Sequence, residues 1–234
     1  MSGHSKWATT KRAKAVVDAK RSSLFTKLTK NIMVAAREGV DPEMNFRLRI
    51  AVDKARVFNM PKDNIERAIK KGSGTGDGQT IETLLYEAYG PEGVALLIEL
   101  LTDNKNRAAS NIKHLLAKHN GKLGGEGSVR WMFEAKGQII LAQNKLTEDE
   151  ELAVIEAGAE DVLNEEPIRI IAQISDLEKV KNNIQDQGFK IESSELTYLA
   201  KEKITPHDPD KLLSLLNDLD DDDDVNNIFT NADI

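Results

Sequence analysis

The stretch YEAYGPEGVALLIELLTDNKNR, residues 86–107, decides the fold. Its Gly-Pro-Glu-Gly cluster at residues 90–93 favours a chain reversal, because proline fixes φ and glycine tolerates positive φ. Residues 94–101 follow this turn and are apolar except for Glu99. A short apolar run bounded by turn residues is typical of a buried strand, although periodicity alone also allows a helix.

A polar, cationic corner follows this expected strand. We expect Thr102 or Asp103 to cap a helix over residues 106–119, which ends at Asn120 and Gly121. Corners that lead into helices present free backbone N–H groups and bind anions readily. The residues expected to contact an anion here are Asn104, Lys105 and Arg107.

Length and composition set the broad class. The 234 residues predict one to three small domains, at roughly 100 to 200 residues per domain. The chain has no cysteine, which excludes disulfides, thiolate metal sites and cysteine nucleophiles and suits a reducing compartment. No signal-peptide pattern opens the sequence, and no apolar run approaches the roughly 20 residues of a membrane helix. We therefore expect a cytoplasmic protein with a mature N-terminus and no membrane partner.

The overall charge of −7 conceals a strong asymmetry. Residues 1–72 contain 17 Lys+Arg and 7 Asp+Glu, a net charge of +10, whereas residues 73–234 carry −17. A basic segment on an acidic protein is typical of polyanion binding.

The basic residues concentrate near the N-terminus around a single aromatic side chain. Residues 5–21 contain only one acid, Asp18, whereas an ordinary exposed helix face usually mixes both signs of charge. Phosphate binding is therefore favoured over a solvated helix face or a frayed tail. The predicted nucleic-acid contacts are Lys6, Trp7, Lys11, Arg12, Lys14, Lys20, Arg21, Lys27 and Lys30.

Helical periodicity predicts a basic three-helix domain over residues 1–72. A first apolar stripe begins at Leu24, a second follows a predicted cap at Asp41, and a third helix starts after residues 59–61 and stops at Gly72. A helix-turn-helix is the alternative, although the last helix offers few side chains suited to base edges.

The Gly-rich residues 73–79 predict a linker. A phosphate-binding loop is the alternative, but no Lys-Ser or Lys-Thr follows the glycines.

Two further α/β domains are predicted beyond this linker, one of them discontinuous. Residues 80–133 and 204–234 form the central domain, in which residues 128–133 are expected to be a strand because Val129, Trp131 and Phe133 alternate. Trp131 is expected in the core, with base stacking as the alternative. Residues 134–203 show a strand and helix order that predicts an inserted ferredoxin-like domain.

No chemical motif predicts catalysis or a cofactor. Residues 220–224 are five consecutive aspartates, but neighbouring side chains do not converge on one ion, so we expect a solvated loop. His114 and His119 lie five residues apart, which is not the i, i+4 spacing of a helical zinc site. A phosphoesterase using the aspartates is the remaining enzyme hypothesis. We expect no enzyme, no metal, no cofactor and no small-molecule substrate.

Several segments, in order along nearly the whole chain, resemble the YebC/PmpR family. They are GHSKW, NMPKDNIERAIKKG, YEAYGP, GVALLIE, TDNKNR, the Gly-rich run before Trp131, EAGAED and DDVNNIFTN. Ala88 stands where the family usually has glycine, and Ala108, Ala109 and Lys113 stand where threonine and arginine are common.

The resemblance implies an α+β fold: an N-terminal three-helix bundle plus two α/β sandwich domains, the third inserted in the second. Bacterial members are commonly labelled DNA-binding transcriptional regulators. Mitochondrial relatives activate translation of cytochrome c oxidase, and some bacterial members relieve ribosome stalling at proline-rich sequences. Two hypotheses follow: a DNA-binding transcriptional regulator, or a ribosome-associated translation factor that binds ribosomal RNA.

Overall fold

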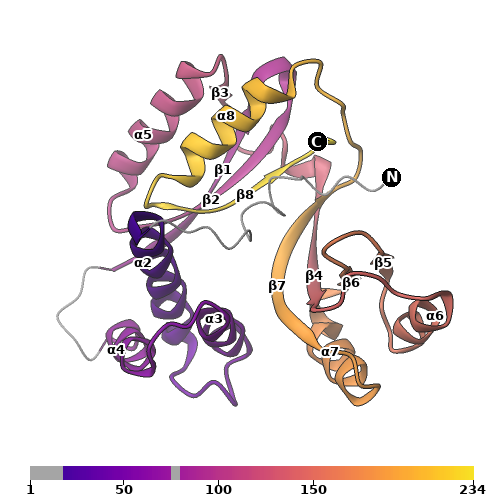
Figure 1. The fold of residues 1–234 in the computed structure, drawn as a ribbon. Coiled ribbons are helices and arrows are strands. Elements are labelled where there is room, and N and C mark those ends of the chain that lie inside the picture. The colour runs from indigo at the N-terminus through magenta and orange to yellow at the C-terminus, as the bar shows by residue number, and fades with distance from the viewer. Residues whose placement is uncertain (1–17, 75–79) are drawn as a thin grey trace. The chain divides into compact units, whose positions relative to one another are not determined.

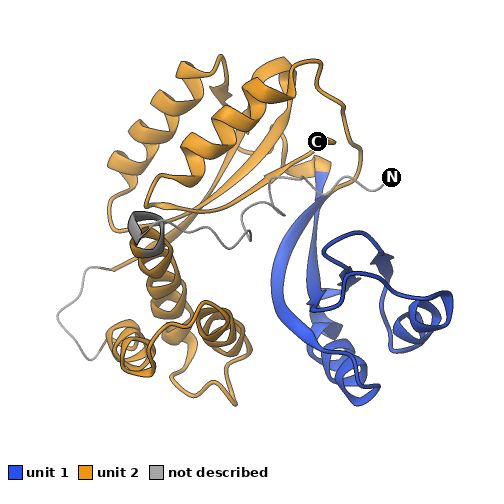
Figure 2. Ribbon diagram, in the orientation of Figure 1, with its two compact units in different colours: residues 1–2, 133–199 blue, residues 3–132, 200–234 orange. Residues whose placement is uncertain are grey.

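A computed structural model describes residues 18–74 and 80–234. The chain is α+β, and its two antiparallel sheets of four strands are separate (Figure 1). One compact unit comprises residues 133–199, and the other holds the described residues before 133 and after 199 (Figure 2).

The N-terminal helices are α2 (Asp18–Ala35), α3 (Phe46–Val57) and α4 (Lys62–Gly72), with a 3-10 turn at Ala36–Glu38. The predicted cap at Asp41 is wrong, because the N-cap of α3 is Asn45. The Asn45 side chain accepts from Leu48 N and donates to Ala35 O and Gly39 O. Asn45 therefore also fixes the connection from α2 to α3.

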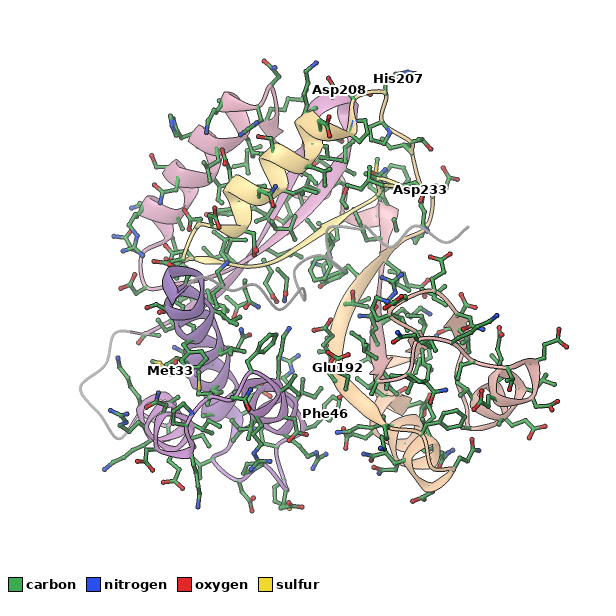
Figure 3. All side chains as sticks on the ribbon, in the orientation of Figure 1. Met33, Phe46, Glu192, His207, Asp208 and Asp233 are labelled. Atoms are coloured by element: carbon green, nitrogen blue, oxygen red, sulfur yellow. The ribbon has the colours of Figure 1, made fainter. Side chains whose placement is uncertain are left out.

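Both α3 and α4 pack on α2 around a shared apolar core that includes Met33 (Figure 3). Gly72 was predicted to stop the third helix and is its last residue. A Cβ at Gly72 would collide with the backbone of Met33, so this glycine also allows α4 to approach α2 closely. The central core members are Leu28, Ile32, Leu48, Val52, Ala55 and Ile65.

The sheet of the same unit has the order β3-β1-β2-β8. Its strands are β1 (Glu82–Tyr89), β2 (Ala95–Thr102), β3 (Lys122–Leu123) and β8 (Val225–Thr230). The turn predicted at residues 90–93 is confirmed, with left-handed φ at Glu92 and Gly93. Helices α5 (Lys105–Lys118) and α8 (Pro209–Asp220) lie on one face of this sheet (Figure 1).

Strand β2 joins two cores. Leu96, Ile98 and Leu100 are fully buried beneath α5 and α8. Leu101, which points to the opposite face by the period of a strand, belongs to the core of the helical bundle. The apolar run predicted as a buried strand is confirmed, and its two faces explain why it lacks the usual alternation.

The unit of residues 133–199 follows the order β-α-β-β-α-β. Its elements are β4 (Phe133–Leu141), α6 (Glu148–Glu156), β5 (Asp161–Leu163), β6 (Arg169–Ala172), α7 (Leu177–Asp186) and β7 (Ile191–Ala200). The strand order β5-β6-β4-β7 is that of a ferredoxin-like sandwich. Thr147 and Glu150 form a complete capping box at α6, where the sequence predicts an acidic first turn.

The strand predicted over residues 128–133 is wrong. Residues Arg130–Met132 form a 3-10 turn, and β4 begins only at Phe133. The expected core position of Trp131 is also wrong, because its side chain is 65% exposed.

Candidate nucleic-acid interface

Two of the predicted phosphate-binding lysines lie on α2 and face the acidic turn after α8. Lys27 Nζ donates to the main-chain oxygen of Asp220 and to its carboxylate, and this lysine is only 8% exposed. Lys30 Nζ donates to Asp223 O and to Asp224 Oδ1, both at 2.8 Å. A phosphate would reach Lys27 only if its contact with Asp220 opened.

Asp224 is the centre of this contact. It is 5% exposed, and its two carboxylate oxygens bind Lys30 and Arg107, each at 2.8 Å. Burial opposes its ionisation, but the hydrogen bonds from Lys30 and Arg107 prevail and lower the pKa of Asp224. The expectation of a solvated acidic loop is therefore wrong for Asp224, which is a buried ion-pair partner.

The corner between β2 and α5 is organised by Asn104. Its side chain accepts from Arg107 N at 3.0 Å, so the predicted caps at Thr102 or Asp103 are wrong. Thr102 instead accepts from Asn104 N through its hydroxyl oxygen. Lys105 Nζ lies 2.6 Å from the Glu82 carboxylate, and Arg107 contacts Asp103 and Asp224. The cations of this corner thus face acids of their own chain.

The structure brings some of the predicted residues together. Lys30 and Arg107 meet on Asp224, with Lys27 one helical turn away, whereas Lys105 is paired separately with Glu82. The side chains of Lys20 and Arg21 on α2 lie outside what the structure describes. Five further predicted contacts lie outside the described residues altogether: Lys6, Trp7, Lys11, Arg12 and Lys14. Residues 75–79 of the predicted linker are outside them too.

Sequence reasoning missed the role of Glu87. This β1 residue is 7% exposed, and its carboxylate accepts from the main-chain nitrogens of Gly127, Val129 and Arg130 at 2.6 to 2.8 Å. Burial opposes ionisation, but these three hydrogen bonds outweigh it and lower the pKa of Glu87. The one available signal was a charged residue shortly before the predicted turn at residues 90–93.

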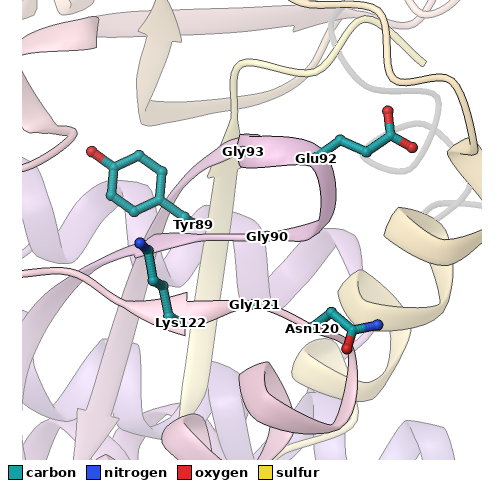
Figure 4. A pocket seen from close by; sticks show the side chains of 7 residues that line it. All are labelled: Tyr89, Gly90, Glu92, Gly93, Asn120, Gly121 and Lys122. Atoms are coloured by element: carbon teal, nitrogen blue, oxygen red, sulfur yellow. The ribbon is translucent and has the colours of Figure 1, made fainter.

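The loop held by Glu87 presents Trp131 at the surface. Trp131 Nε1 donates to Ser128 O at 3.1 Å, and the Tyr89 hydroxyl donates to the same oxygen at 3.0 Å. Lys122 Nζ lies 5.7 Å from the centre of the Tyr89 ring, and the Lys122 side chain extends toward Tyr89 (Figure 4). Beside them is an open pocket of about 550 Å³, lined by Tyr89, Gly90, Glu92, Gly93, Asn120, Gly121 and Lys122.

Family models cover both parts of the chain. The TACO1/YebC protein N-terminal domain matches residues 5–75, and the TACO1/YebC second and third domain matches residues 81–232. The chain belongs to the TACO1/YebC family. The family expected from the sequence motifs is thereby confirmed.

Relatives of this TACO1/YebC chain match it along its length. A Thermosipho melanesiensis protein is 48% identical, covering 100% of this chain and 94% of the relative. A Kosmotoga olearia protein is 49% identical, covering 99% of this chain and 94% of the relative. Each is named "Probable transcriptional regulatory protein". The crystal structure of the conserved hypothetical protein Aq1575 from Aquifex aeolicus has a TM-score of 0.89 and 42% identity, covering 97% of this chain and 96% of that one.

The names of these relatives place the TACO1/YebC chain in a family of regulatory proteins. Within residues 18–74 and 80–234, no group of three or more His, Asp or Glu side chains is arranged to hold a metal ion. His119 Nε2 instead lies 2.8 Å from Asp218 Oδ2. None of the helices in the described parts of the chain is both long and apolar enough to cross a bilayer.

Proposed function

We propose that this chain is a non-enzymatic, DNA-binding transcriptional regulator. The observation that carries the proposal is the charge separation, +10 over residues 1–72 against −17 over the rest. Such a basic segment attracts a polyanion and releases its counterions, which supplies most of the affinity of non-specific nucleic-acid binding. The regulatory names of the relatives support the same class of function.

The phosphates contact the basic side chains near the N-terminus, where Asp18 is the only acid among residues 5–21. Residues 5–17 contribute Lys6, Lys11, Arg12 and Lys14, and α2 continues them with Lys20 and Arg21. Lys105 and Arg107 form a secondary contact at the β2–α5 corner, where both side chains are about half exposed beside their acidic partners. Lys27 and Lys30 act mainly by fixing α2 on the acidic turn.

Salt-dependent binding of labelled duplex DNA to the full chain, followed by fluorescence anisotropy, tests this proposal. Replacing Lys11 by Glu should weaken binding and lower the slope of log K against log salt by about 0.9, the contribution of one phosphate contact. The matched control is Lys145→Glu, an equal charge change at an exposed lysine of the other unit. Equal slopes for the two variants, or no DNA binding at low salt, would refute the proposal.

A ribosome-associated translation factor is the second candidate. The exposed Trp131 favours it, because sequence-specific RNA recognition uses unstacked bases on aromatic side chains, whereas duplex bases are covered. Phosphate contacts do not separate the two candidates, since they position a protein without reading sequence. Co-sedimentation of the full chain with ribosomes, compared with footprints on promoter and random DNA, decides between them. Ribosome association without promoter preference would replace the transcriptional assignment by the translational one.

A further inference from the structure

We propose that Trp131 is a second nucleic-acid contact, which stacks on one unpaired nucleobase. The inference rests on the proposed function only in taking nucleic acid as the partner. It adds a site away from the basic bundle and names its ligand as an unpaired base of RNA or DNA.

The exposure of Trp131 is the first support. Tryptophan is a large apolar residue that is highly buried on average, yet 65% of this side chain is exposed. Its single polar atom is already satisfied, because Nε1 donates to Ser128 O. The surface that remains available is apolar and aromatic, and it therefore suits stacking rather than hydrogen-bonded readout.

The second support is the rigidity of the segment that carries Trp131. The Glu87 carboxylate accepts hydrogen bonds from three main-chain amides of this loop, those of Gly127, Val129 and Arg130. Gly124 N donates to Glu87 O, and a Cβ at Gly124 would collide with the Ser128 side chain. An exposed indole that makes no core contacts does not need a rigid loop for packing. A preorganised aromatic surface does gain from it, because less conformational entropy is lost on binding.

Positive charge beside the indole supplies the third support. Arg130 is exposed and precedes Trp131 directly. Lys122 is exposed on β3, and its Nζ lies over the Tyr89 ring, whose hydroxyl shares Ser128 O with Trp131. An aromatic surface flanked by cations is the arrangement that binds single strands, the cations contacting the backbone and the ring contacting a base.

Fluorescence of the full chain tests the site directly. The sequence has two tryptophans, so in a Trp7→Phe background Trp131 is the only indole. Four probes of equal length are titrated: single-stranded RNA, single-stranded DNA, the DNA duplex and an abasic DNA strand. We expect the two single strands to quench Trp131, and the duplex and the abasic strand to leave it unquenched even where anisotropy shows that they bind. In the unbound protein, acrylamide should quench the fluorescence of Trp131.

Variants measure the affinity that depends on stacking. Trp131→Ala should weaken single-strand binding about tenfold. Trp131→Phe should retain most of the wild-type affinity, because stacking tolerates a smaller ring. Leu152→Ala, which removes an apolar side chain of similar exposure (62%) from the other unit, should have no effect. Thermal unfolding of each variant verifies the fold.

The outcomes separate this inference from the proposed function. Binding of single strands without quenching of Trp131, or an acrylamide-shielded indole, would overturn the stacking site and leave the basic bundle as the contact. Absence of binding by all four probes would overturn both. Quenching by RNA alone or DNA alone would confirm the site and identify which nucleic acid supplies the base.

Discussion

At the scale of single residues, Glu87 shows how one carboxylate organises a surface loop. Its pKa is lowered by three main-chain hydrogen bonds despite burial. Because the folded-state pKa lies below the unfolded one, this contribution to stability is present above the unfolded pKa, about 4.3 for glutamate. It is lost as the pH falls through the folded-state pKa.

Glu87→Gln should lower the free energy of unfolding by about 2 kcal/mol, since hydrogen bonds to a charged acceptor are each worth about 1.5 to 3 kcal/mol and glutamine retains only one acceptor oxygen. Urea unfolding at pH 7 measures the loss, and Glu126→Gln, at an exposed position in the same loop, is the control. The difference between wild type and Glu87→Gln should shrink below pH 4. A difference independent of pH would mean that the glutamine disturbs packing rather than removing a charge.

At the scale of elements, the contact between α2 and the acidic turn after α8 depends on Asp224. Removing a buried carboxylate while its cationic partners remain is strongly destabilising, by about 3 to 5 kcal/mol. Asp224→Asn should therefore destabilise the unit by about 3 kcal/mol at pH 7, measured by urea unfolding. Asp221→Asn, an equal charge change at an exposed residue of the same turn, is the control.

The acid dependence of the Asp224 contact has a defined sign. The pKa of Asp224 is lowered, so its stabilisation is complete above the unfolded value of about 3.9 and is lost as the pH falls through the folded value. The Asp224→Asn chain should consequently lose less stability than wild type as the pH falls below about 4. Parallel acid curves for the two chains would show that the ion pairs with Lys30 and Arg107 contribute nothing.

Elements with strong periodicity were predictable from the sequence, and those set by distant partners were not. The apolar run of residues 94–101, which became β2, is too hydrophobic to remain exposed, so its burial was predictable. The alternation of Val129, Trp131 and Phe133 imitated a strand, but Glu87 takes the Val129 amide that a strand would use in a ladder. The three-residue strand β5 carries too little pattern to be predicted from the sequence.

At the scale of the molecule, the charge asymmetry could be predicted from the sequence, but the ion pairs between its basic and acidic parts could not. Lys30 and Asp224 are separated by 194 positions, so no local pattern pairs them. Through this contact and that of Lys27 with Asp220, part of the positive charge of the basic helical domain neutralises part of the acidic turn at residues 220–224. The exposed Trp131 was also unpredictable, because its environment depends on a carboxylate 44 residues earlier in the chain.

Residues 133–199 leave and rejoin the rest of the chain at one place, where Lys201 N donates to Met132 O at 2.9 Å. Two residues joined by a main-chain hydrogen bond are close enough for a loop of about 2 to 5 residues to connect them. Replacing residues 133–199 with a short Gly-Ser loop should therefore leave a chain that unfolds cooperatively and retains duplex binding, measured by circular dichroism and anisotropy against the full chain. A folded, shortened chain that no longer binds DNA would place an essential contact within residues 133–199, because the basic bundle and its acidic turn would both still be present.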